Sequence, residues 1–128
     1  MALNLEVAEA IGEIKGTFPG ASVEVREDGE GGAFVIVDPI DPGSQYVQPE
    51  SWIGFRITFQ YPNSDVYPHF VRGDLSRKDG RPLGEATSVT TFEGRFAVQL
   101  SRRSNNIDPN HDTAVLKLLK VLAWLRSR

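Results

Sequence analysis

The densest group of side chains that could bind a ligand or take part in chemistry is a polar segment near the C-terminus. It contains two hydroxyls, two guanidiniums and two amides, in the order Ser101, Arg102, Arg103, Ser104, Asn105 and Asn106. Guanidinium groups bind carboxylates and phosphates through paired hydrogen bonds, and amides can bind peptide groups. The segment is therefore predicted to bind an anion or a peptide backbone, with a plain exposed loop as the alternative.

The residues of hydrolytic and metal enzymes are sparse in this chain. His69 and His111 are the two histidines, and cysteine is absent, which excludes thiolate chemistry, disulfides and cysteine-ligated zinc. A triad of Ser101, His111 and Asp112 can be written down, but no nucleophile elbow accompanies it. Glycines 29, 31 and 32 occupy a hairpin turn rather than a phosphate-binding loop. We expect neither a metal nor a cofactor.

Charge is distributed unevenly along the chain. The net charge is −3, yet residues 95–128 contain seven Lys/Arg against two Asp, a balance of +5, which leaves −8 for residues 1–94. This asymmetry indicates an electrostatically oriented partner, or simply a solvated basic face on the last helix. No aromatic residue is interleaved with Arg102 and Arg103, and the chain is acidic overall, so nucleic acid is not the expected partner.

Periodicity predicts the elements that must position these groups. Residues 3–14 have helical spacing, with Leu3, Val7, Ile11 and Ile14 on one face and Glu6, Glu9 and Glu13 on the wet side. Alternating patterns predict strands over 22–26, 33–37, 53–61, 69–72, 88–92 and 95–100, the last two joined by a Glu93-Gly94 turn. A second helix is expected to begin at Asp108-Pro109, with an apolar face of Val115, Leu118, Leu119, Leu122 and Leu125.

These elements predict one α+β domain spanning residues 1–128. A lone antiparallel meander exposes an apolar face, and the N-terminal and C-terminal helices are expected to pack on it. No apolar run approaches the roughly 18 residues of a membrane span, and the acidic start does not have the pattern of a secretory signal. We therefore expect a cytoplasmic protein without membrane contact.

Two motifs resemble the ubiquitin-conjugating (E2, or UBC) fold and its RWD relatives. The strand ending in Phe59-Gln-Tyr-Pro62, followed by Val66-Tyr-Pro-His-Phe70, is similar to the E2 pattern in which Tyr-Pro ends one strand and Pro precedes the next. Gly94-Arg-Phe-Ala-Val98 resembles the E2 stretch Gly-x-Ile-Cys-Leu, which places Ala97 at the position of the catalytic cysteine. The His-Pro-Asn that usually precedes this cysteine is missing, and a single helix follows. The later segment looks more like divergent bacterial E2-like proteins.

The resemblance implies an E2-like component of a bacterial conjugation pathway, with an E1-like adenylating enzyme and a ubiquitin-like protein as partners. It also implies that the first helix, with Glu6, Glu9 and Glu13, faces the E1-like enzyme. Three interpretations of Ala97 remain. In the first, it replaces a natural cysteine in an inactivated form. In the second, a hydroxyl of Ser101 or Ser104 is the acceptor, with His111 as the base and with Arg102 and Arg103 stabilising the negative charge that develops; in the third, the chain is a non-catalytic E2-variant or RWD-type binding module.

Overall fold

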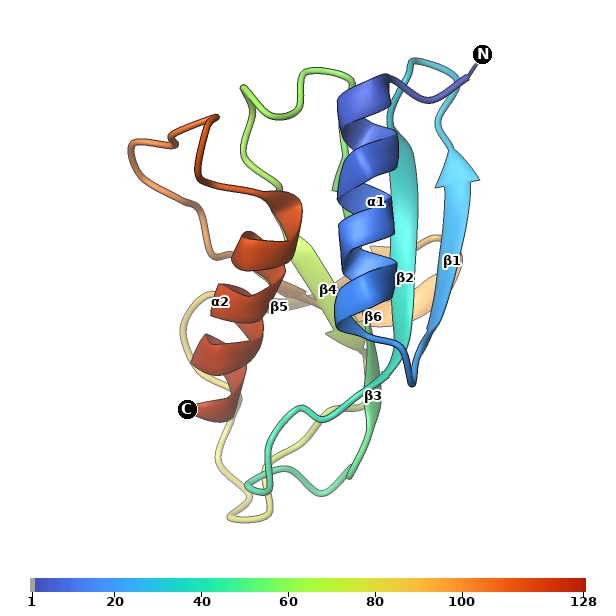
Figure 1. Cartoon of the computed structure of the whole chain (residues 1–128). Coiled ribbons are helices and arrows are strands. Elements are labelled where there is room, and N and C mark those ends of the chain that lie inside the picture. The colour runs from blue at the N-terminus through green and yellow to red at the C-terminus, as the bar shows by residue number, and fades with distance from the viewer. Residues whose placement is uncertain (1) are drawn as a thin grey trace.

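Two helices and a six-stranded antiparallel sheet make up the structure, a computed structural model that describes residues 2–128. Helix α1 (Leu5–Thr17) comes first and α2 (Ala114–Arg126) comes last. The strands between them are β1 (Ser22–Glu27), β2 (Ala33–Ile40), β3 (Ser51–Ile57), β4 (His69–Arg72), β5 (Thr87–Phe92) and β6 (Arg95–Leu100). Both helices lie on one face of the sheet, as the α+β prediction requires (Figure 1).

The sheet departs from the predicted meander after its fourth strand. Its order is β1-β2-β3-β4-β6-β5, so β6 pairs with both β4 and β5, and β5 is an edge strand. The Glu93-Gly94 turn has φ values of 50° and 78°, the left-handed conformation that suits a tight hairpin between twisted strands. The hairpin prediction is thus confirmed, while the simple meander is wrong because β4 pairs with the second hairpin strand rather than with the first.

The core lies between the helices and the sheet face that they cover. Alternate strand residues point toward the helices, because successive side chains of a strand lie on opposite faces; they include Val35, Val37, Ile53, Phe55, Ile57, Val71, Val98 and Leu100. The helices contribute Val7, Ala10, Ile11, Ile14, Leu118, Val121, Leu122 and Leu125. Leu119, which we expected on the apolar face of the second helix, is exposed.

Helix α2 begins five residues later than the sequence predicted, with Ala114 rather than Pro109 as its first residue. Thr113 is its N-cap, and the Thr113 hydroxyl accepts a hydrogen bond from the backbone N–H three residues later at 3.2 Å. Asp108 is instead used in a turn of its own, where its carboxylate accepts a backbone N–H two residues later at 3.0 Å and contacts the His111 ring at 2.6 Å. The Asp108-Pro109 prediction of the helix start is therefore wrong, since a local turn competes for the same carboxylate.

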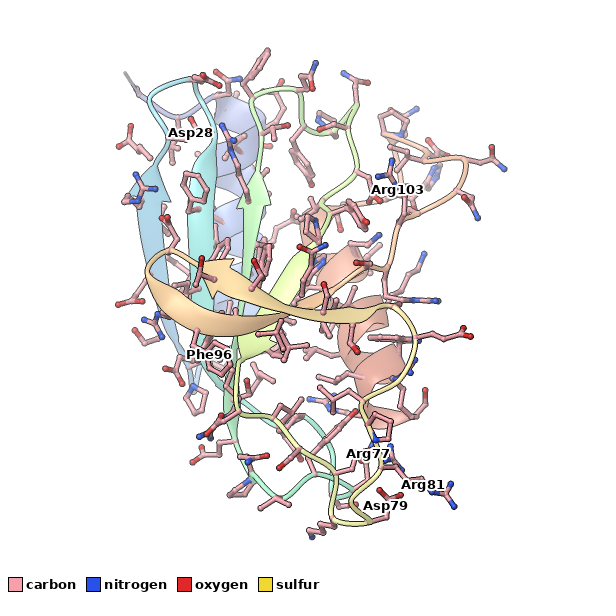
Figure 2. The ribbon with its side chains drawn as sticks, turned by 180° about the vertical axis from the view of Figure 1, so that it is seen from behind. Asp28, Arg77, Asp79, Arg81, Phe96 and Arg103 are labelled. Atoms are coloured by element: carbon pink, nitrogen blue, oxygen red, sulfur yellow. The ribbon has the colours of Figure 1, made fainter. Side chains whose placement is uncertain are left out.

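The opposite face of the sheet is covered by the β5–β6 hairpin, which bends across it (Figure 2). Phe92 near the hairpin turn stacks on Phe70 of β4, with ring centroids 4.5 Å apart, and on Trp52 of β3 at 6.2 Å. Gly54 of β3 makes room for this ring, because a Cβ at that position would lie 2.5 Å from a Phe92 ring carbon. The hairpin thus turns an exposed sheet face into a second, aromatic cluster.

Ion pairs hold the turn of this hairpin to the far edge of the sheet. Glu93 accepts two hydrogen bonds from the Arg26 guanidinium, at 2.6 and 2.9 Å, and Arg95 donates to Glu24 at 2.9 Å. The hydrogen bonds to Glu93 raise the pKa of the Arg26 guanidinium above its ordinary value. Each pair joins β1 to the hairpin, so the hairpin spans the sheet from the β4 side to β1.

Candidate functional site

Ala97, the residue at the cysteine position of the E2 resemblance, lies within β6. It is 0% exposed and has strand neighbours on both sides, Arg72 of β4 and Thr90 of β5. Its side chain packs in the cluster with Ile36 and Phe92. In this arrangement the C-terminus of another protein has no access to the side chain at position 97.

Ser104 lies in a polar clamp that joins three segments of the chain. Its backbone N–H donates to Asp65 at 2.6 Å, and its hydroxyl accepts from the Lys117 ammonium at 2.6 Å. Lys117 also donates to both carboxylate oxygens of Asp65 at 3.1 Å. The side chains of Lys117 and Asp65 are 9% and 15% exposed. The clamp fastens the 101–106 loop to α2 and to the segment that precedes β4.

The clamp orients the loop rather than activating Ser104. An ammonium group has three N–H donors and no lone pair, so Lys117, as the partner of a carboxylate, cannot accept the hydroxyl proton of Ser104. Asp65 is occupied by Lys117 and by the backbone of Ser104. The signal for this clamp in the sequence is a lysine on the apolar side of α2, which needs a partner when it is buried.

The two arginines of the loop stack on aromatic rings. The Arg102 guanidinium lies 5.0 Å from the ring centroid of Trp124 on α2, and the Arg103 guanidinium lies 4.5 Å from that of Tyr67. Within residues 2–128, neither arginine forms a salt bridge with a carboxylate. Stacking therefore holds both guanidiniums in place while leaving their N–H donors free for a ligand.

A cleft with a volume of about 230 Å³ separates this loop from α2. It is lined by Arg102, Arg103, Ser104, Asn105, Asp112, Lys117, Lys120 and Val121. Asn105 is exposed, and its side-chain amide has no hydrogen-bond partner in the described part of the chain. Asn106 turns the loop with a left-handed φ of 53°. The predicted binding residues Arg102, Arg103 and Asn105 thus come together at one cleft.

The predicted hydroxyl–base pairs are not assembled. Ser101 ends the hairpin, and its hydroxyl accepts from the Gln99 amide at 3.1 Å. The His111 side chain is 80% exposed and bonds to Asp108. The pKa of the Asp108 carboxyl is lowered, mainly by a hydrogen bond from a backbone N–H of the same turn and secondly by the hydrogen bond to the His111 ring. No hydrogen bond in residues 2–128 joins His111 to Ser101 or Ser104.

The acidic surface predicted for α1 is present but separate from the cleft. Glu6, Glu9 and Glu13 are exposed, while Val7, Ala10, Ile11 and Ile14 of the same helix are buried. The structure thus presents an acidic helix face and a basic cleft as two distinct surfaces.

His69 was predicted only as a strand residue, but its environment in β4 is chemically unusual. Its ring is 0% exposed, lies 5.2 Å from the Phe55 ring, and has no hydrogen-bond partner at either nitrogen. The pKa of His69 is lowered to about 3, mainly by burial and secondly by the nearby charge of Lys117. The carboxylate of Asp65 has a smaller effect in the opposite direction. Its alternation with Val71, a residue of the covered face, was the available signal for this burial.

The described residues contain no group of three or more His, Cys, Asp or Glu side chains that could hold a metal ion. No helix among residues 2–128 has the length and apolar character needed to cross a membrane. A scan against protein-family models finds no match to the chain, and searches of curated proteins and of solved structures also find none.

Proposed function

We propose that this chain is a non-catalytic E2-like module, which positions a ubiquitin-like protein for an E1-like enzyme without accepting it covalently. The proposal combines the E2 resemblance with one observation, the burial of Ala97 between two strands and beneath the Phe92 cluster. An acceptor thiol or hydroxyl must be accessible to its substrate and ionise near a base or a positive charge. A side chain at position 97 does not meet the first requirement, because it is fully buried.

The two serines offer weak alternatives as acceptors. The Ser104 hydroxyl is tied to an ion-paired lysine, and the Ser101 hydroxyl is bonded to a glutamine amide. His111, the base expected for either serine, is engaged with Asp108. These contacts favour binding over group transfer.

The exposed acidic face of α1 is the proposed docking surface for the E1-like enzyme. Its three glutamates lie on the side of the helix away from the core, where a basic partner surface can reach them. The assignment of this face comes from the E2 resemblance, and its exposure in the structure is compatible with it.

The test uses the E1-like and ubiquitin-like proteins encoded in the same genome, with ATP. Binding is measured by calorimetry, and adduct formation is followed on gels with and without reductant and hydroxylamine. We expect a non-covalent complex and no adduct on the chain, and binding to the E1-like enzyme at least tenfold weaker when the α1 glutamates are changed to lysine. The matched control carries Glu27→Lys, Glu50→Lys and Glu85→Lys, three exposed positions outside α1.

Two results would contradict the proposal. An adduct that resists reductant, is cleaved by hydroxylamine and is lost in Ser101→Ala or Ser104→Ala would identify an oxyester acceptor. If the chain binds neither protein although the E1-like enzyme is active, the chain is an interaction domain without a role in ubiquitin-like conjugation.

A further inference from the structure

The cleft beside α2 has an excess of positive charge that the internal contacts of the fold do not use. Four cations line it, Arg102, Arg103, Lys117 and Lys120, against the single carboxylate of Asp112. Lys117 is neutralised by Asp65 behind the cleft, and Lys120 lies 3.9 Å from Asp112. The two arginines therefore remain as uncompensated charges in a chain whose net charge is −3.

These cations continue along one side of α2. Lys117, Lys120 and Trp124 are spaced by three and four residues, which places them in one row of α2, and Arg128 follows beyond the end of the helix. Arg128 lies 4.4 Å from the Trp124 ring that Arg102 also contacts. At about 1.5 Å per helical residue the row from Lys117 to Trp124 is on the order of 10 Å long, the span of about three residues of an extended peptide.

We propose that this cleft binds a short, extended acidic segment of a protein partner, with Arg102 and Arg103 pairing its carboxylates. Guanidiniums that are already held in place by aromatic stacking lose little side-chain freedom on binding a carboxylate. The free amide of Asn105 supplies a donor and an acceptor for a peptide group of the ligand.

The contacts favour an acidic peptide over a nucleic acid. Proteins that bind single-stranded nucleic acid combine a basic groove with aromatic rings on which bases stack. Here the two rings near the cleft, Trp124 and Tyr67, are already in contact with guanidiniums. The acidic remainder of the chain also opposes a long polyanion, whereas a short peptide feels mainly the local excess of positive charge. This inference is independent of the E2-like assignment, since it uses only the charges and contacts of the cleft.

The experiment measures binding of a fluorescein-labelled short peptide that alternates Asp or Glu with Val, by fluorescence anisotropy on the whole chain. An otherwise identical peptide with Asn and Gln is the uncharged control, and an oligothymidylate and inorganic phosphate are the competing polyanion and oxyanion. The doubly substituted Arg102→Gln/Arg103→Gln chain is compared with Lys78→Gln/Arg81→Gln, which removes two exposed charges from a loop that does not line the cleft.

We expect saturable binding of the acidic peptide that weakens with added salt, at least a tenfold loss in the Arg102→Gln/Arg103→Gln chain, and less than a twofold change in the Lys78→Gln/Arg81→Gln chain. Both arginines are exposed, so circular dichroism should show the variant folded. Equal losses in the two variants would reduce the effect to net charge and overturn the proposal. It would also be overturned by no binding at millimolar peptide, or by oligothymidylate or phosphate binding as tightly as the peptide.

Discussion

Acidification from pH 6.5 to 4.5 should destabilise this protein through His69. The ring is wholly buried with two unpartnered nitrogens, and its pKa is lowered from 6.5 to about 3 in the folded chain. Between these two values the unfolded chain binds the proton and the folded chain does not, so the free energy of unfolding falls as the pH falls. The stabilisation is complete above the unfolded pKa and is lost progressively down to pH 3.

The magnitude follows from the separation of the two pKa values. Linkage gives a slope of up to about 1.4 kcal/mol per pH unit, so the two-unit step to pH 4.5 should remove about 2 kcal/mol. This window lies above the ordinary Asp pKa of 3.8, so the ion-paired carboxylates whose pKa is lowered, such as Asp28 and Asp79, contribute their own losses only at lower pH.

Urea denaturation followed by circular dichroism at pH 6.5, 5.5 and 4.5 measures this loss. The His69→Leu chain should show little dependence on pH in this window, and at pH 6.5 it should be at least as stable as the unmodified chain, because an unpaired buried N–H is removed. His111→Gln, a change at the exposed histidine, is the matched control and should follow the unmodified chain. The same loss of stability on acidification in His69→Leu as in the unmodified chain would refute the assignment.

Two further changes test the packing around the candidate site. Gly54→Ala should destabilise the fold by about 1 to 3 kcal/mol in urea denaturation, because the new methyl group must displace the stacked Phe92 ring; an unchanged midpoint would contradict this packing. Asp65→Ala should cost about 3 kcal/mol, because it leaves the Lys117 ammonium buried without its carboxylate. The control Asp112→Ala, which faces an exposed lysine at 3.9 Å, should cost less than about 1 kcal/mol, and equal costs would argue against the clamp.

Local patterns in the sequence predicted most individual elements of the fold. The amphipathic spacing of α1, the alternation of β3 and the Glu93-Gly94 turn all appear in the structure, because each depends on neighbouring residues. The predicted strand over 53–61 was too long, since β3 ends at Ile57 and the chain turns after it. The position of β6 between β4 and β5 was not predictable from these patterns, since pairing partners depend on which sheet edge is available. The start of α2 was misplaced because Asp108 and Thr113 are both good N-cap residues, and only Thr113 is used as one.

The candidate site was predictable in part. The polar segment stood out by composition, and Arg102, Arg103 and Asn105 do line one cleft. Lys117 on the apolar side of α2 signals a buried cation, but its partners Asp65 and Ser104 could not be predicted, because they come from separate segments that meet only in the folded chain. The aromatic partners of the two arginines could not be predicted either, because they are distant from the arginines in the sequence.

The most direct test of the non-catalytic proposal is the reactivity of a thiol placed at position 97. The chain has no cysteine, so Ala97→Cys reports on that position alone, and Ser88→Cys on the exposed edge of β5 is the matched reactive control. With an aromatic disulfide reagent, we predict that Ala97→Cys is unreactive in the folded chain and reacts once urea unfolds it, while Ser88→Cys reacts in both states. Rapid reaction of folded Ala97→Cys, especially with formation of a thioester to the ubiquitin-like protein, would contradict the proposal and make position 97 an acceptor site.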